Sequence, residues 1–228
     1  MRICIFSDVH GNYETFHKML EAERGNVEKF IFAGDLFGYF YHQSEIIRDL
    51  MNLPELLAVK GNHDKYYLTC KEKTNLIDKY GSSYLFELPD LQKDFIASMP
   101  EYISTEIAGK RIGIFHGGPE DFVEQRIYPD SQVDFSSVFE EYDIVILGHT
   151  HYRMEKKVGN TLILNPGSLG QPRDGNGFSY CVLDLEDESC CFKTVDIQLE
   201  ELLLQVKEKD ADKTAGAYLL KKYGSKKV

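Results

Sequence analysis

The chain has 228 residues, of which 43% are hydrophobic and 12% aromatic, so it can bury a sizeable core. Its 37 acidic side chains outnumber the 26 basic ones and give a formal net charge of −11 at pH 7. Such a surface repels a phosphate backbone, which argues against general nucleic-acid binding unless positive charge is supplied locally. The five cysteines form neither a CxxC motif nor a disulfide framework, so we expect reduced thiols.

The N-terminal segment has the pattern of a buried strand. Arg2 to Phe6 is a short apolar run that ends in a polar turn. No secretory signal precedes it, and no apolar run in the chain has the length of a membrane span. The sequence therefore predicts a cytoplasmic protein that does not associate with membranes.

The first half alternates strand and helix patterns. Periodicity and turn residues define each element, and Pro100 marks the end of the last one. In chain order we expect a strand at Arg2 to Phe6, a helix at Asn12 to Glu23, a strand at Val27 to Ala33, a helix at Ser44 to Met51, a strand at Leu56 to Val59, and helical structure from Thr69 to Met99 that is broken near Gly81 and at Leu88-Pro89.

The second half contains more hairpin signals. Three pairs of strands flank turns, a short helix is expected at Val133 to Glu141, a strand at Asp143 to Leu147, and an amphipathic helix from Gln198 to about Leu220. We expect an α/β fold, a four-layer α/β/β/α sandwich in which two mixed sheets pack face to face with helices outside. Residues 1–228 would form a single domain, with about 198–228 as its C-terminal helix and tail. The hairpin turns are at Ala108-Gly109-Lys110, Gly159-Asn160 and Asp187-Glu188.

Five short polar fragments follow the predicted strands. The carboxyl ends of strands in an open α/β sheet form its ligand crevice, so fragments far apart in sequence can meet there. Their carboxylate, imidazole and amide groups, without thiolate, suit Mn, Fe, Zn, Ni or Co better than a structural zinc site. The fragments are Ser7-Asp8-Val9-His10-Gly11, Gly34-Asp35, Gly61-Asn62-His63-Asp64, His116-Gly117-Gly118 and Gly148-His149-Thr150-His151.

These ligand types predict a two-metal hydrolytic site. Asp8 and His10 are two residues apart and cannot share the face of a straight strand, so the chain must bend, as Gly11 permits. Two metals about 3.5–4 Å apart need a bridging group, and Asp35 is the natural candidate. His63 exceeds the number of ligands needed, so we assign it as the general acid that protonates the leaving group. A role as a spare ligand is the alternative.

With these fragments the chain resembles the calcineurin-like metallophosphoesterases, in particular the small bacterial and archaeal phosphodiesterase-type members. The resemblance runs from Ile3 to about Asp184. It implies two divalent ions, with manganese the first candidate, and attack on a phosphodiester by a hydroxide held between them. The implied first-metal ligands are Asp8, His10 and His151; Asp35 bridges; the second-metal ligands are Asn62, His116 and His149; and His63 polarises the leaving group.

Two further stretches refine this resemblance. The loop from Asn165 to Gly175 is similar to one that is typical of the phosphodiesterase-type subgroup. Gly38 and Tyr39 occupy the positions where the protein phosphatase branch has an Asp that orients the catalytic His and an Arg that clamps phosphate. Without the Arg a dianionic monoester loses a bidentate partner. The sequence therefore favours small phosphodiesters or nucleotides as substrates.

Several alternatives stay open. A dinucleoside polyphosphate pyrophosphohydrolase is a second enzyme class that fits the same residues. A non-catalytic protein-binding scaffold would be expected to have lost ligand residues, and none is missing here. We expect His17 at the surface, whereas His42, Arg173 and the Tyr39 to Tyr41 cluster could contact substrate or serve structure alone. The stripe from Leu199 to Val206 fits either core packing or a homodimer contact.

Overall fold

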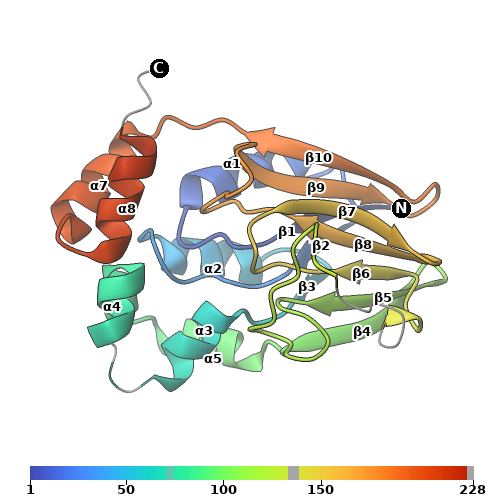
Figure 1. Ribbon diagram of the computed structural model, residues 1–228. Helices are drawn as coiled ribbons and strands as arrows, with labels where there is room; N and C mark the ends of the chain where they lie inside the picture. Colours follow the sequence, from blue (N-terminus) through green and yellow to red (C-terminus); the bar gives the residue numbers. More distant parts are fainter. Residues whose placement is uncertain (71, 73, 133–138, 225–228) are drawn as a thin grey trace.

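The computed structural model describes residues 1–70, 72, 74–132 and 139–224 and contains two five-stranded mixed β-sheets (Figure 1). Parallel and antiparallel pairs occur in both sheets, which confirms the predicted fold class. The first sheet has, in spatial order, β10 (Ser189–Val195), β9 (Phe178–Asp184), β1 (Arg2–Phe6), β2 (Lys29–Phe32) and β3 (Leu56–Ala58). The second has β4 (Tyr102–Ile107), β5 (Lys110–Phe115), β6 (Ile144–Ile146), β8 (Thr161–Pro166) and β7 (Arg153–Val158).

A layer of β-branched side chains holds the sheets together. Ile3 and Ile5 of β1 share one fully buried cluster with Ile112 and Ile114 of β5. Alternate residues of a strand point to opposite faces, so the intervening Cys4 belongs to the cluster on the other side of the first sheet. Burial of each large apolar side chain contributes about 1.5–3 kcal/mol. This packing brings the carboxyl ends of β1 and β5 to the same region.

Helices cover the outer face of the first sheet. They include α1 (Tyr13–Glu23), α2 (Gln43–Met51) and α5 (Asp90–Ser98), whose buried residues join the cluster that contains Cys4. The outer face of the second sheet is covered by a smaller apolar cluster that includes Phe115 and Phe139. The helix predicted at Val133 to Glu141 falls largely on residues 133–138, which lie outside the described residues.

The helical region predicted from Thr69 to Met99 is divided differently in the structure. Its first helix, α3, begins at Asn62, inside the third polar fragment, because the Asp64 side chain accepts the backbone N–H of the N-cap residue Gly61. The region consists of short, separate segments. They are α3 (Asn62–Thr69), α4 (Thr74–Tyr80), a 3₁₀ turn η1 (Ser82–Leu85) and α5.

The single C-terminal helix predicted from Gln198 to about Leu220 is wrong. The structure has two helices, α7 (Glu200–Asp210) and α8 (Thr214–Tyr223), which stand beside α4 (Figure 1). Gly216 lies so close to the last residue of α7 that a Cβ there would be 1.7 Å from the Asp210 carbonyl oxygen. The chain therefore doubles back at Asp210, whose buried carboxylate accepts hydrogen bonds from Tyr41 and Ser82.

Two further expectations concern the cysteines and the length of apolar helices. The five cysteines are all free, as predicted. Within the described part of the chain, no helix combines the length and the apolar character that crossing a bilayer requires.

Candidate metal centre

All eight residues predicted for the site lie together at the carboxyl ends of the strands. Asp8 follows β1, Asp35 follows β2, and His116 follows β5. Asn62 and His63 open α3, while His149 and His151 lie between β6 and β7. None of these residues is more than 6% exposed. The two packed sheets thus bring ligand-type side chains separated by more than 140 positions into one buried cluster.

The backbone of this cluster is unusual. Asp8, His10, Asp35, His149 and His151 all have φ between 49° and 70°. This left-handed conformation is uncommon for residues other than glycine and costs free energy, so it persists only where the surrounding structure imposes it. The chain therefore turns at the ligand-type residues themselves, and not only at the glycine that follows His10.

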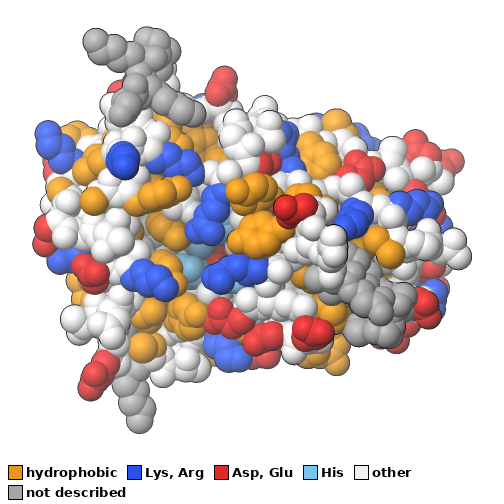
Figure 2. Space-filling model, viewed as in Figure 1, with side chains coloured by type: hydrophobic (Ala, Val, Ile, Leu, Met, Phe, Trp, Pro, Cys, Tyr) orange, Lys and Arg blue, Asp and Glu red, His pale blue; other side chains and the backbone are white. Residues whose placement is uncertain are grey.

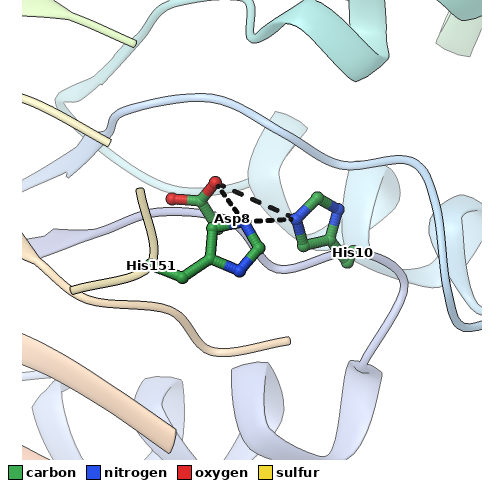
Figure 3. A group of neighbouring side chains, drawn as sticks. All are labelled: Asp8, His10 and His151. Atoms are coloured by element: carbon green, nitrogen blue, oxygen red, sulfur yellow. Dashed lines mark hydrogen bonds and ion pairs between the residues drawn. The ribbon is translucent and has the colours of Figure 1, made fainter. Parts of the chain in front are cut away.

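Asp8, His10 and His151 form one group of side chains within the cluster (Figure 3). The Nε2 atoms of His10 and His151 lie 3.1 Å apart, and His151 Nε2 lies 3.2 Å from Asp8 Oδ1. His10 Nε2 lies 3.9 Å from the same carboxylate oxygen. Three potential ligand atoms therefore converge on one point.

Asn62, His116 and His149 lie on the other side of Asp35. Asn62 Oδ1 is 3.2 Å from His116 Nε2, and the rings of His116 and His149 are 5.0 Å apart. Asp35 Oδ2 is 3.3 Å from His116 Nε2 and 3.9 Å from His10 Nε2. This oxygen therefore lies between the two groups of side chains.

Backbone carbonyls hold three of the imidazoles by their Nδ1 atoms. His10 Nδ1 is 2.5 Å from the Phe37 carbonyl oxygen, His116 Nδ1 is 2.7 Å from that of Ala33, and His151 Nδ1 is 2.6 Å from that of Gln171. A carbonyl can only accept, so each Nδ1 carries a proton, and each ring turns an unprotonated Nε2 inward when it is neutral. This is the tautomer and orientation in which proteins present histidine to a metal.

The donor set fits divalent cations. The unprotonated Nε2 atoms of His10 and His151 face each other, and Asp8 Oδ1 and His149 Nε2 are buried without a hydrogen-bond partner among the described residues. Lone pairs that converge in a dry interior repel one another unless a cation lies among them. Oxygen and imidazole ligands suit the borderline metals manganese, iron, cobalt, nickel and zinc. The residues therefore fit metal binding on their own geometry.

The electrostatics of the cluster also favour added positive charge. Burial raises the pKa of Asp35. Burial would also raise that of Asp8, but the neighbouring His151 and His116 lower it. Burial would lower the pKa of His116, yet the Asp35 carboxylate raises it to about 9, while burial and the His116 charge lower that of His149 to about 3. One proton on His116 balances one carboxylate, whereas divalent cations would balance both.

Comparison with known proteins identifies the family. The model of the calcineurin-like phosphoesterase superfamily domain matches residues 1–188. The chain belongs to this superfamily. Its fold and family are those of phosphoester hydrolases that use divalent metals.

Known relatives support the assignment over most of the chain. An uncharacterised protein of Methanocaldococcus jannaschii is 31% identical over 207 residues, which cover 81% of this chain and 83% of the relative. A phosphodiesterase of the same organism is 30% identical over 169 residues, which cover 73% and 83%. The crystal structure of a metallophosphoesterase from Sphaerobacter thermophilus superposes with a TM-score of 0.76 at 24% identity over 91% of this chain and 93% of that one.

His63 has a hydrogen-bond partner that the sequence did not indicate. Its Nδ1 lies 2.6 Å from the hydroxyl oxygen of Tyr84, a fully buried residue of η1. Gly38 occupies the position where the protein phosphatase branch has an Asp that orients the catalytic His. A Cβ at Gly38 would be 2.8 Å from His63 Nδ1. A side chain at Gly38 would therefore require the His63 ring to shift. The hydroxyl of Tyr84, 21 residues beyond His63, contacts this nitrogen instead.

Asp64 is a second residue whose role the sequence did not reveal. Its carboxylate accepts the backbone N–H of Asp35 at 3.0 Å, of Leu36 at 2.7 Å and of Gly61 at 2.9 Å. These bonds tie the loop after β2 to the first turn of α3. Asp64 therefore fixes Asp35 relative to Asn62 through the backbone, without pointing into the cluster itself.

The loop between β8 and β9 supports the cluster from behind. Ser168 Oγ donates to the Asp8 carbonyl oxygen at 2.8 Å, and Asn165 Nδ2 donates to that of Gly148 at 2.6 Å. The Gln171 carbonyl holds His151, as described above. At Gly170 a Cβ would be 2.4 Å from the Val9 carbonyl oxygen, so only glycine permits this close approach. The loop that resembles the phosphodiesterase-type subgroup thus positions ligand-type residues.

The remaining candidates fall in different places. His17 is exposed on α1, as expected, and pairs with Glu21. His42 is hydrogen-bonded to Gln205 at 3.2 Å and does not reach the cluster. Tyr39 packs edge-on against the His10 ring at 4.9 Å, and Arg173 Nη2 lies 3.4 Å from the Tyr39 hydroxyl. Of the residues that sequence left open, Tyr39 and Arg173 are therefore the two beside the centre.

Proposed function

We propose that this chain is a phosphodiesterase that uses two divalent ions, with manganese the first candidate. The main support is the buried cluster, in which backbone carbonyls turn three imidazole Nε2 atoms toward two carboxylates and an amide oxygen. In this proposal Asp8, His10 and His151 hold the first ion. Asn62, His116 and His149 would hold the second ion, and Asp35 would reach both.

The protein groups around the metals orient the reaction. When bound, the two ions would polarise the phosphate and activate the attacking water. The carbonyls of Phe37, Ala33 and Gln171 keep the imidazoles fixed, so little reorganisation is needed as charge develops in the transition state. Asp35 Oδ2 is within 3.9 Å of ligand nitrogens in both groups, which suits a bridging position.

His63 is proposed to donate the proton that the leaving oxygen takes up. Burial raises the pKa of the Tyr84 hydroxyl well above its usual value, so that hydroxyl stays protonated. It has no other hydrogen-bond acceptor among the described residues, so it donates to His63 Nδ1. The neutral ring then carries its proton on Nε2, which lies 4.0 Å from Asp35 Oδ2 and faces the centre. Tyr84 thereby orients the Nε2–H toward the centre. For the ring to be neutral after it gives this proton to the leaving oxygen, Nδ1 takes up another proton from solvent, and the Tyr84 hydroxyl oxygen can then accept a hydrogen bond from it.

A diester fits this centre better than a phosphoprotein. The positions that supply the orienting Asp and the clamping Arg of the protein phosphatase branch hold Gly38 and Tyr39. A relative that is 30% identical over 73% of this chain is named a phosphodiesterase. Both observations support hydrolysis of a phosphodiester in which water oxygen bonds to phosphorus and the leaving oxygen departs with a proton.

The test is hydrolysis of bis-p-nitrophenyl phosphate by protein loaded with Mn²⁺. Asp35→Asn should lower kcat for this substrate to background, and His63→Gln should lower kcat by about 10²-fold for a dinucleoside monophosphate, whose leaving alkoxide needs a proton. His17→Gln is the matched control, since His17 is an exposed histidine of α1. Full activity of Asp35→Asn would contradict the assignment of the metal site.

We further propose that the chain functions as one domain in the cytoplasm, on small phosphodiesters or nucleotides. Its net charge of −11 supports small substrates, because this charge disfavours contact with a long phosphate backbone. Gel filtration with light scattering would decide between a monomer and the homodimer that the sequence left open.

A further inference from the structure

A pocket of about 400 Å³ opens beside the metal centre. Tyr39 and Tyr80 line it, and they also contact the centre. The Tyr39 ring is 4.9 Å from that of His10, and the Tyr80 ring is 4.4 Å from that of His63. The volume lies in the range of small-molecule sites. A ligand held here would have one end next to the reacting phosphate. We call this site the tyrosine–cation pocket.

Of the residues that the structure describes, three cations and no acidic side chain line the tyrosine–cation pocket. They are Lys79, Arg126 and Arg173. None of them has a carboxylate within 4.0 Å among the described residues, although acidic side chains outnumber basic ones by 11 in the whole chain. Figure 2 shows Lys and Arg side chains gathered around the place where histidine atoms reach the surface. The local charge is therefore opposite in sign to that of the protein.

Both arginines line the pocket beside the centre. Arg173 Nη2 lies 3.4 Å from the Tyr39 hydroxyl, and the Arg173 backbone N–H donates to the His151 carbonyl oxygen at 3.1 Å, while Arg126 lines the same pocket. A phosphodiester has one negative charge, which two divalent ions already exceed. The additional cations are therefore placed for anionic groups beyond the scissile phosphate.

Tyrosine rings provide the apolar part of the pocket. Tyr80 of α4 is partly buried, Tyr218 of α8 is 43% exposed, and Lys79 Nζ lies 4.9 Å from the centre of the Tyr80 ring. Exposed aromatic faces beside cations are a recurrent platform for stacking nucleobases. Cations and rings in one pocket match a ligand that combines phosphates with a base.

One wall of the pocket comes from outside the segment that matches the superfamily model. The match ends at residue 188, whereas Tyr218 belongs to α8. The wall is firmly attached, because Asp210 accepts hydrogen bonds from Tyr41 and Ser82, and Thr214 Oγ1 donates to Asp78 on α4 at 3.2 Å. Part of the pocket wall therefore lies outside the segment that the superfamily model matches.

We propose that the tyrosine–cation pocket binds a nucleotide with at least one phosphate besides the scissile one. The base stacks on Tyr80 and Tyr218, and Arg126, Arg173 and Lys79 bind the additional phosphate. This inference rests on the proposed function, since it names the substrate class of the same centre. On hydrolysis, the oxygen of one water bonds to the scissile phosphorus, the bond from that phosphorus to the leaving oxygen breaks, and a proton passes to that oxygen.

The test is binding of α,β-methylene-ADP, a non-hydrolysable nucleotide, measured by calorimetry on metal-loaded protein. Adenosine, AMP and inorganic phosphate are compared under the same conditions. We expect the methylene diphosphate to bind about tenfold more tightly than AMP or phosphate, and adenosine to bind more weakly still. Arg126→Gln, Arg173→Gln and Tyr218→Leu should each raise its Kd about tenfold.

Matched controls separate local from general effects. Arg24→Gln removes an exposed arginine at the end of α1, and Tyr102→Leu removes a tyrosine of β4 with 46% exposure. Both should leave the Kd unchanged. Equal affinity for inorganic phosphate and the methylene diphosphate, or a Kd that Arg126→Gln and Tyr218→Leu do not change, would overturn the inference.

Hydrolysis of bis-p-nitrophenyl phosphate, which has neither base nor second phosphate, distinguishes failure of the pocket from failure of the centre. If that diester is cleaved while the nucleotide binds no better than phosphate, the pocket inference fails and the proposed function stands. If the nucleotide binds through Arg126 and Tyr218 but neither it nor the diester is cleaved by metal-loaded protein, the pocket inference holds and the proposed function fails.

Discussion

The metal centre and the tyrosine–cation pocket are neighbours built in opposite ways. In the centre every side chain is buried, and imidazoles such as His10 and His116 are fixed by main-chain carbonyls. In the pocket, Arg126, Arg173 and Lys79 are long, exposed side chains without carboxylate partners among the described residues. The centre also lies within the segment matched by the superfamily, while part of the pocket lies beyond it.

This difference suggests a division of labour. Ligands held by the backbone of strand ends cannot move without rearranging the sheets, so they suit chemistry that requires fixed geometry. Exposed side chains on α4 and α8 can change without disturbing the core, so they suit selection of the substrate. Changes in the centre should therefore abolish turnover, whereas changes in the pocket should alter affinity.

The largest expected effect is that of removing the metals. Treatment with a chelator should reduce hydrolysis to background, and Mn²⁺ should restore it. Because ions that bind only the folded state stabilise it, metal at 100 times its Kd should also add about 2.7 kcal/mol to the free energy of unfolding. Assays and thermal melts of stripped and reloaded protein check both points. Unchanged turnover after verified metal removal would show that the buried centre does not depend on metals for hydrolysis.

The Tyr84→Phe substitution should have the next largest effect. Without the hydroxyl, no donor to His63 Nδ1 favours the tautomer with its proton on Nε2. We therefore expect kcat to fall about tenfold for a dinucleoside monophosphate, because its leaving alkoxide needs a proton. The loss should be smaller for bis-p-nitrophenyl phosphate, whose leaving group is stable as an anion. Tyr67→Phe is the control, since its hydroxyl donates to the Phe86 carbonyl instead. Equal losses on both substrates would assign Tyr84 a structural role only.

Asp64→Asn should act mainly on stability. The carboxylate accepts three backbone N–H groups, and the amide would replace one acceptor oxygen by a donor that faces them. We expect a loss of about 1.5–3 kcal/mol in the free energy of unfolding. Urea denaturation of metal-free protein measures it, with the exposed Asp94→Asn as the control. A loss no greater than that of the control would show that the loop after β2 is held by other contacts.

Near neutral pH the smallest expected effect is a pH dependence of stability in metal-free protein. The pKa of His149 is lowered from 6.5 to about 3, chiefly by burial. Between these values the unfolded chain binds the proton and the folded chain does not, so stability falls as the pH falls from 6.5 toward 3. One such group contributes up to about 1.4 kcal/mol per pH unit. His149→Asn should show a shallower slope in urea titrations at several pH values; an identical slope would contradict the shift.

The sequence predicted the centre better than the pocket for a physical reason. Asp8, Asp35 and His149 follow apolar runs, and a strand that ends in a polar group is visible as a local pattern. Sheet topology then brings these ends together. The left-handed backbone at the same residues was not predictable, because it is imposed by contacts such as Ser168 with the Asp8 carbonyl, 160 positions away.

Features that depend on long-range packing were missed. Tyr84 lies between two predicted breaks in the helical region from Thr69 to Met99, and nothing local connects it to His63. Arg126 lies outside every predicted element, and the pocket wall depends on the reversal between α7 and α8 at Asp210. The helical periodicity continues through that reversal, so the sequence predicts one helix where the structure has two.

Anomalous scattering from a crystal of the Mn²⁺-loaded protein tests the central claim most directly. We expect two peaks about 3.5–4 Å apart. One should be bounded by Asp8, His10 and His151, the other by Asn62, His116 and His149, with Asp35 reaching both. A single peak, or two peaks that Asp35 does not join, would contradict it.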